Sequence, residues 1–267
     1  MGILNQIKSA LLKSNGQDAP TTQALAAIKR DGRLHIRSQV PKVLDGYVSL
    51  AEGAPRGQLV NLSYGGLAAT FDNLSPALAP NQEHILRLSL LDSSISSKAR
   101  LLRIKPLDSQ KTMAAFALIH DEARNLLFLR NHIEPLCEGG SLMLIPLEAR
   151  KDRYRSPEWH CFRGDRSSDL IFLKTATENR VIELLLTFPW QEGYRQVLYQ
   201  NGKISTGAVD GPGESTALGT PTVRSTAHPD PLIARAAICI LASVPEPYGV
   251  LLAPLITQLI AIFAARS

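Results

Sequence analysis

The strongest pattern in the chain is an alternation of apolar and polar residues between positions 40 and 119. In "ILRLSL", the apolar residues Leu86, Leu88 and Leu90 alternate with polar ones. Such alternation is typical of half-buried strands, and "VLDGYVSL" (43 to 50), "ARLLRI" and "TMAAFALI" continue it. Turn signals separate these segments at intervals of roughly ten residues. We therefore predict a small all-β barrel or sandwich.

Helical spacing flanks this region on both sides. A short helix is predicted over residues 2 to 13, and a second one follows, capped by Thr21 or Thr22. After the strands, a helix is predicted to begin near Asp121 and to end at "CEGG". The pair Gly139–Gly140 is the predicted domain boundary.

The second half of the chain has a weaker pattern. Residues 150 to 166 look basic and irregular, whereas "DLIFLKTA" and "RVIELLLTF" are typical of strands. The dipeptide Asn201-Gly202 is a strong hairpin signal inside "YRQVLYQNGKISTG". Residues 210 to 230 are rich in Gly, Pro, Ser and Thr, so we expect a long loop or linker there. The second half is thus expected to be a smaller α+β domain.

Two apolar segments end the chain, and residues 247 to 265 contain no charged side chain. That length is close to a membrane span of roughly 20 residues, but Pro254, Thr257 and Gln258 weaken the pattern. We expect residues 231 to 265 to pack as core helices. Inner-membrane association through residues 247 to 265 stays open as the alternative, and with it a membrane contact.

The composition indicates a folded intracellular protein without catalytic groups. The 267 residues are 45% hydrophobic, enough for a sizeable core. Cys137, Cys161 and Cys239 are far apart with no CxxC, which argues against disulfides or a zinc site and favours a reducing compartment. No signal peptide is evident, so a cytoplasmic location is expected. His160 and Cys161 are adjacent and should point to opposite faces of a strand, so they do not predict a catalytic pair.

The charge is mildly basic and is concentrated at the N-terminus. The formal net charge is +5, and residues 1 to 37 hold six cations against two carboxylates. No long basic run of the kind that binds nucleic acid is present. A local cluster favours a small anionic ligand over DNA or RNA. No phosphate loop, catalytic triad or metal-ligand cluster is found, so we expect neither an enzyme nor a metal site.

Two short motifs give this basic region a chemical meaning. "RLHIR" puts Arg33 and Arg37 four residues apart, and arginine can pair with phosphate, fork onto guanine O6 and N7, or stack on a base. In "NLSYGG", Asn61 and Ser63 share one strand face, with Val60 and Leu62 on the other. Gly66 allows a close approach to the backbone. Together these groups match a compact anionic purine nucleotide.

In this order and spacing the motifs resemble the RxxxR and D/NxSxxG signature of the PilZ family, bacterial receptors for cyclic di-GMP. The resemblance covers residues 30 to 137, and Asn61 stands where many members have Asp. It implies a PilZ-like antiparallel β-barrel that binds cyclic di-GMP on its outer surface. The ligand residues it implies are Arg33, Arg37, Asn61, Ser63 and the Gly66 backbone, with no further cofactor.

We therefore predict three parts: an N-terminal helical arm (1–29), a PilZ-like β-barrel domain (30–138) and a C-terminal α+β domain (141–267). The expected function is that of a non-enzymatic receptor that relays cyclic di-GMP binding to an unidentified protein partner. Two alternatives stay open: an interaction scaffold whose barrel no longer binds nucleotide, and an enzyme regulated by the barrel.

Overall fold

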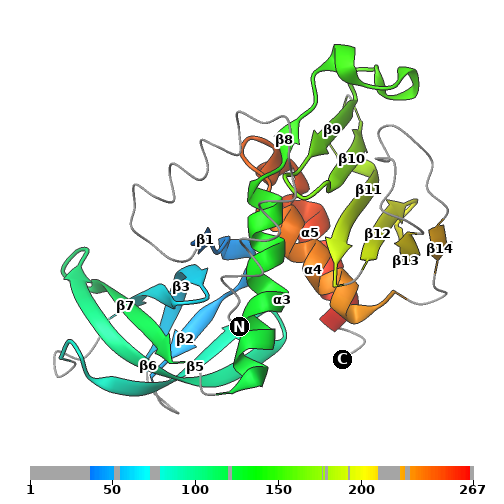
Figure 1. The fold of residues 1–267 in the computed structure, drawn as a ribbon. Helices are drawn as coiled ribbons and strands as arrows, with labels where there is room; N and C mark the ends of the chain where they lie inside the picture. The colour runs from blue at the N-terminus through cyan, green and yellow to red at the C-terminus, as the bar shows by residue number, and fades with distance from the viewer. Residues whose placement is uncertain are drawn as a thin grey trace, which may run out of the picture. The chain divides into compact units, whose positions relative to one another are not determined.

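The computed structural model describes residues 37–50, 55–72, 79–119, 122–175, 177, 180–191, 193–209, 223–225 and 229–264. Figure 1 shows the fold. Arg37–Ser267 forms one compact unit. The two helices predicted before residue 30, together with Arg33, lie outside the described residues, as does most of the predicted loop at 210 to 230.

The predicted β-rich region forms a closed antiparallel barrel. Strand β3 pairs with β2 on one side and with β4 on the other, and β5, β6 and β7 complete the ring between β2 and β4. A short strand β1 is added beside β3. The bounds are β1 (Ser38–Gln39), β2 (Tyr47–Ser49), β3 (Arg56–Ser63), β4 (Gly66–Asp72), β5 (Glu83–Leu90), β6 (Ser93–Pro106) and β7 (Lys111–Ile119).

The alternation seen in the sequence fills the barrel interior. Leu86, Leu88 and Leu90 are all fully buried, and Phe71 and Phe116 pack into the same cluster. Burying each such side chain contributes roughly 1.5–3 kcal/mol to folding. The prediction of strands with one apolar face is therefore confirmed for this half of the chain.

The strand predicted over residues 43 to 50 is wrong in its first part. Residues Lys42–Leu44 form a short 3-10 helix, η1, and β2 begins only at Tyr47. Between them, Asp45 adopts a left-handed conformation with φ 47°. A left-handed residue cannot continue a strand, so the chain turns there while Leu44 still reaches the core.

Two β-bulges interrupt the strict alternation of the barrel strands. In β3 the register with β4 shifts between Leu59 and Asn61, and in β6 the register with β7 shifts between Leu101 and Arg103. A bulge opposes two residues on one strand to one on its partner, so the facing of later side chains changes. Leu59 and Leu62, three residues apart, are consequently both buried, and Val60 is not the inward neighbour of Leu62 that the sequence predicts.

Helix α3 (Ala123–Gly140) follows the barrel, as predicted from the apolar stripe and "CEGG". Leu129, Ile133 and Leu136 are buried. The helix, green in Figure 1, packs against strands β1, β3 and β6 of the barrel and against helix α4. It is therefore in contact with both halves of the described unit.

The second half forms an open antiparallel sheet in which each strand pairs with the next along the chain. Its hairpin at Asn201-Gly202 is confirmed, since both residues have positive φ, as a tight two-residue turn requires. Residues 150 to 166 are not wholly irregular, because they contain β9. The bounds are β8 (Met143–Leu144), β9 (Trp159–Arg163), β10 (Asp169–Lys174), β11 (Val181–Trp190), β12 (Gly193–Gln200), β13 (Lys203–Val209) and β14 (Val223–Ser225), with 3-10 turns η2 (Leu147–Ala149) and η3 (Asp152–Tyr154).

The apolar segments at the end of the chain are helices α4 (Pro231–Ala242) and α5 (Tyr248–Ala264). Asp230 caps α4 by accepting hydrogen bonds from the backbone of Leu232 and Ile233. Both helices contribute buried side chains to the core, as expected. Within the part of the chain that the structure describes, no helix combines the length and apolarity that a membrane crossing needs.

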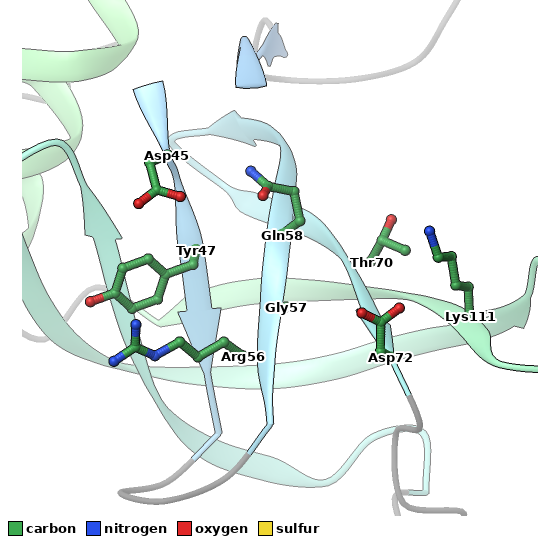
Figure 2. Close-up of a pocket in the computed structure, with 8 residues that line it drawn as sticks. All are labelled: Asp45, Tyr47, Arg56, Gly57, Gln58, Thr70, Asp72 and Lys111. Carbon is green, nitrogen blue, oxygen red and sulfur yellow. The ribbon is translucent and has the colours of Figure 1, made fainter. Parts of the chain in front are cut away.

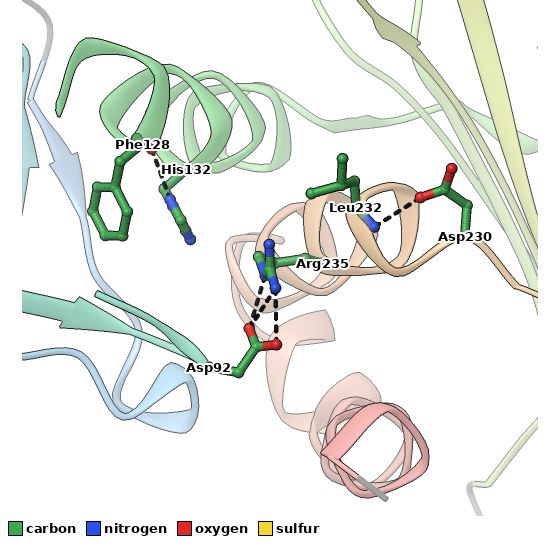
Figure 3. A network of polar contacts seen from close by, with 6 residues as sticks. All are labelled: Asp92, Phe128, His132, Asp230, Leu232 and Arg235. Atoms are coloured by element: carbon green, nitrogen blue, oxygen red, sulfur yellow. Dashed lines mark hydrogen bonds and ion pairs between the residues drawn. The ribbon is translucent and has the colours of Figure 1, made fainter. Parts of the chain in front are cut away.

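A polar junction links the barrel to the second half (Figure 3). Arg235 of α4 donates two hydrogen bonds of 2.8 Å to the carboxylate of Asp92, in the turn between β5 and β6. Nearby on α3, the buried His132 donates from Nδ1 to the carbonyl of Phe128. Desolvation lowers the pKa of His132 to about 4. The imidazole is therefore neutral at physiological pH.

Candidate functional site

Arg37, the last residue of the RxxxR motif, leads directly into a strand beside the predicted polar strand. Arg37 is exposed and directly precedes β1, which pairs with β3 in the register Ser38↔Leu62 and Gln39↔Asn61. One further step along this antiparallel register places Arg37 opposite Ser63. A segment separated from the motif strand by more than twenty residues is thereby brought to it. Arg33 lies outside the described residues.

Asn61 carries an unsatisfied acceptor. Its side chain is half-buried, and its Oδ1 is inaccessible to solvent and has no hydrogen-bond partner among the described residues. A buried polar atom left unpaired costs about 1–3 kcal/mol, so a donor brought by a ligand would relieve that cost.

Ser63 has a structural partner. It is 4% exposed, and its hydroxyl donates a 3.0 Å hydrogen bond to the carbonyl of Gly66, across the turn between β3 and β4. The hydroxyl therefore stabilises the turn. Its two lone pairs leave it able to accept a further hydrogen bond.

Gly66 is required by the sheet. A Cβ at this position would overlap the carbonyl oxygen of Phe116 on the neighbouring strand β7. The close backbone approach predicted at Gly66 is thus an approach to another strand of the barrel. The neighbouring turn continues this contact, because Leu118 donates from its backbone to the carbonyl of Gly65 at 3.1 Å.

Beyond the motif, the outer face of the barrel is lined by very small side chains. Gly66 and Ala68 on β4 lie opposite Ala117 and Ala115 on β7. The inward residues of the same strands belong to the core, so these four project outward. We call them the small-residue floor. None of the four has a side chain larger than a methyl group, and Ala68 and Ala115 are only 5% and 6% exposed.

The motif turn is tied to helix α3. Tyr64 donates to Oε1 of Glu134 at 3.5 Å, and burial, reinforced by the charge of Glu134, raises the pKa of Tyr64 to about 12. On the arm side, the Ser38 hydroxyl and the Cys137 thiol lie 2.9 Å apart, within hydrogen-bond distance. Burial raises the pKa of Cys137, so the thiol stays protonated. Both sides of the site therefore touch one helix.

A hollow lies further along β3, away from the motif residues (Figure 2). It has a volume of about 280 Å³, and the guanidinium of Arg56 sits 4.6 Å above the ring of Tyr47 on its wall. Sequence reasoning did not single out this hollow, and none of the predicted site residues lines it. Its lining residues are Asp45, Tyr47, Arg56, Gly57, Gln58, Thr70, Asp72 and Lys111.

The remaining candidate groups are structural. Cys161 packs with Tyr154 and Ile171, whereas His160 stacks on Phe172 at 4.9 Å, so the two point to opposite faces as predicted. The three cysteines are free. Over the described ranges, no group of three or more His, Cys, Asp or Glu side chains is arranged to hold a metal ion.

Comparison with known proteins finds similar solved structures. The PilZ domain with c-di-GMP of YcgR from Escherichia coli is 19% identical, over 37% of this chain and 86% of that chain, with a TM-score of 0.30. The PlzA protein of Borreliella burgdorferi, a crystal structure in complex with c-di-GMP, is 12% identical, over 90% of this chain and 99% of that chain, with a TM-score of 0.31. No family model and no curated protein matches the sequence.

Proposed function

We propose that this chain is a cyclic di-GMP receptor built on a PilZ-type barrel. The observation that carries the proposal is the pairing of β1 with β3, because it puts the end of the RxxxR arm beside the NxSxxG strand. Either motif alone is common in unrelated proteins, but a ligand site needs both in one place. The exposed Arg37 and the unpartnered Oδ1 of Asn61 add a free cation and a free acceptor.

The ligand lies on the small-residue floor, with the arm folded against one side. Arg33 and Arg37 pair with a phosphate and with the O6/N7 edge of one guanine, and Asn61 accepts from a base donor. Ser63 and the backbone at Gly66 complete the contact. Two arginines facing a dianion favour a compact, doubly charged nucleotide over a long nucleic acid.

Binding is relayed through α3 to the second half of the chain. The helix contacts Ser38 of β1 through Cys137 and the motif turn through Glu134. Glu134 also lies 3.5 Å from Arg166, which precedes β10, and the backbone at Gly139 packs directly on α4. A ligand that orders the arm changes what α3 contacts, and a partner that reads the second half can respond.

Calorimetric titration of cyclic di-GMP into the full-length protein tests the receptor function. We expect saturable binding and a clear preference over cyclic di-AMP, because guanine presents two acceptors to an arginine fork and adenine replaces one with a donor. Absence of binding at saturating ligand would exclude a receptor. Equal affinity for both dinucleotides would leave a receptor but remove base reading.

A non-binding interaction scaffold is the second candidate. It is favoured by the structural explanations available for Ser63 and Gly66, since a turn hydrogen bond and a strand contact would preserve both residues without a ligand. The same titration separates the two candidates. A folded protein that binds no cyclic di-GMP but captures a defined partner would support the scaffold.

A further inference from the structure

A row of cations runs along the outer face of β6. Lys98, Arg100, Arg103 and Lys105 are all exposed, whereas Ala99 and Leu101 between them are fully buried. With a strict period of two, Lys98 and Arg100 would point to one face of the strand, and Arg103 and Lys105 would point to the other. The bulge at Leu102 adds one residue between them and brings all four to the same face.

This row borders the small-residue floor on the side opposite the motif. The pairings run in two ladders across the barrel, one from Ser63 over Gly66 and Ala117 to Arg100, the other from Asn61 over Ala68 and Ala115 to Arg103. Neighbouring strands are about 4.8 Å apart, so three steps add up to about 14 Å along the curved outer surface of the barrel. Arginine is long enough to reach back over part of that width.

The two arginines differ in what already holds them. Arg100 is paired with Glu83 at 3.1 Å, whereas Arg103 forms no hydrogen bond or ion pair within the described ranges. Arg103 also stands on the ladder that starts at Asn61. It is therefore a cation at the β6 border of the floor that has no partner among the described residues.

The chemistry of the floor indicates which part of a ligand lies there. The methyl groups of Ala68, Ala115 and Ala117 offer no donor to a phosphate, but they can support the flat, apolar face of a base. Cyclic di-GMP has two guanines, and the arm and motif side provides groups for one of them. The other half of the ligand is left over the floor, toward β6.

We propose, resting on the receptor function above, that Arg103 binds the second guanine of cyclic di-GMP through a forked contact to its O6/N7 edge. The site thus has an arginine on each side, Arg37 before β1 on one and Arg103 of β6 on the other. This arrangement explains how a single barrel face distinguishes a dinucleotide from a mononucleotide, because only the longer ligand spans both sides.

Calorimetry on the full-length protein and three variants tests the proposal. Arg103→Ala should weaken cyclic di-GMP binding at least tenfold, and Arg103→Lys should recover little, because an ammonium cannot fork. Arg87→Ala is the matched control: Arg87 is also an exposed arginine on the barrel, but it pairs with Ser96, outside the part of β6 that borders the floor. Its affinity should stay within twofold of wild type. Thermal melting confirms that each variant is folded.

The outcomes separate this proposal from the one on which it rests. If wild type binds cyclic di-GMP and Arg103→Ala binds it within twofold of wild type, the Arg103 contact is excluded, while the receptor function is retained. Full recovery by Arg103→Lys would overturn the forked contact. If wild type itself does not bind, the receptor function fails and the Arg103 contact fails with it.

Discussion

Two arginines on the barrel and two arginines in the C-terminal half have opposite environments. Arg37 and Arg103 on the barrel are exposed, and the described part of the chain gives them no ion pair. In the second half, Arg150 is buried and donates to the carbonyls of Ile145 at 2.9 Å and Trp159 at 2.6 Å, and Arg163 pairs with the buried Asp169. Arg37 and Arg103 are left available for a ligand, whereas Arg150 and Arg163 hold neighbouring segments of the second half together.

The largest expected effect comes from Gly66, where strands β4 and β7 approach each other closely. Gly66→Val should destabilise the protein by about 3 kcal/mol or more and remove binding, because the side chain would overlap the carbonyl of Phe116. Gly140→Ala is the matched control, since a Cβ at Gly140 meets nothing within 4 Å. Urea unfolding measures both. A fully stable Gly66→Val would mean that the strands can separate there without cost.

The junction between the halves should be sensitive to acid. His132 has a folded pKa of about 4, below its unfolded value near 6.5, so the neutral form is favoured in the fold. Its contribution is complete above pH 6.5 and is lost as the pH falls toward 4, up to roughly 3 kcal/mol. Unfolding of wild type and His132→Gln should be compared at pH 7 and pH 4.5. An equal loss in both proteins would mean that His132 is not the responsible group.

Substituting one arginine from each half tests the comparison directly. Arg37→Ala, like Arg33→Ala, should abolish measurable binding without unfolding, since a charge-assisted contact is worth about 1.5–3 kcal/mol, roughly tenfold to over a hundredfold in affinity. Arg150→Ala should cost a similar amount of stability, because two backbone carbonyls lose the donor that a buried arginine gives them, while the affinity stays unchanged. Calorimetry measures the affinity of each variant for cyclic di-GMP, and urea unfolding measures its stability. If Arg37→Ala melts much earlier than wild type, Arg37 is structural.

Ser63→Ala should have the smallest effect. A neutral hydroxyl bond contributes about 0.5–1.5 kcal/mol, so binding should weaken no more than about tenfold. Because the hydroxyl also holds the turn to Gly66, a small loss of stability should accompany it. Calorimetry and thermal melting check the two effects. A loss larger than that of Arg37→Ala would make Ser63 the main contact and contradict the ranking.

The sequence alone determined the barrel strands, helix α3, the Asn201-Gly202 hairpin and the apolar terminal helices. Each of these depends on interactions between residues close in the chain: a period of two, a period of about four, or a turn dipeptide. The two motifs could be recognised for the same reason. The domain boundaries and the ligand roles of the site residues stay predictions.

Tertiary structure decided how the site residues face. Local periodicity placed Val60 beside Leu62 on the inner face and would divide the cations of β6 between two faces. The bulges at Val60 and Leu102 overturn both readings, because a bulge depends on how two strands match their hydrogen bonds and leaves no mark on the alternation of a single strand. Gly66 likewise meets its neighbour only once β4 and β7 pair. The sequence identified the motif residues of the candidate site, whereas only the pairing of strands in the closed barrel connects Arg103 of β6 to them.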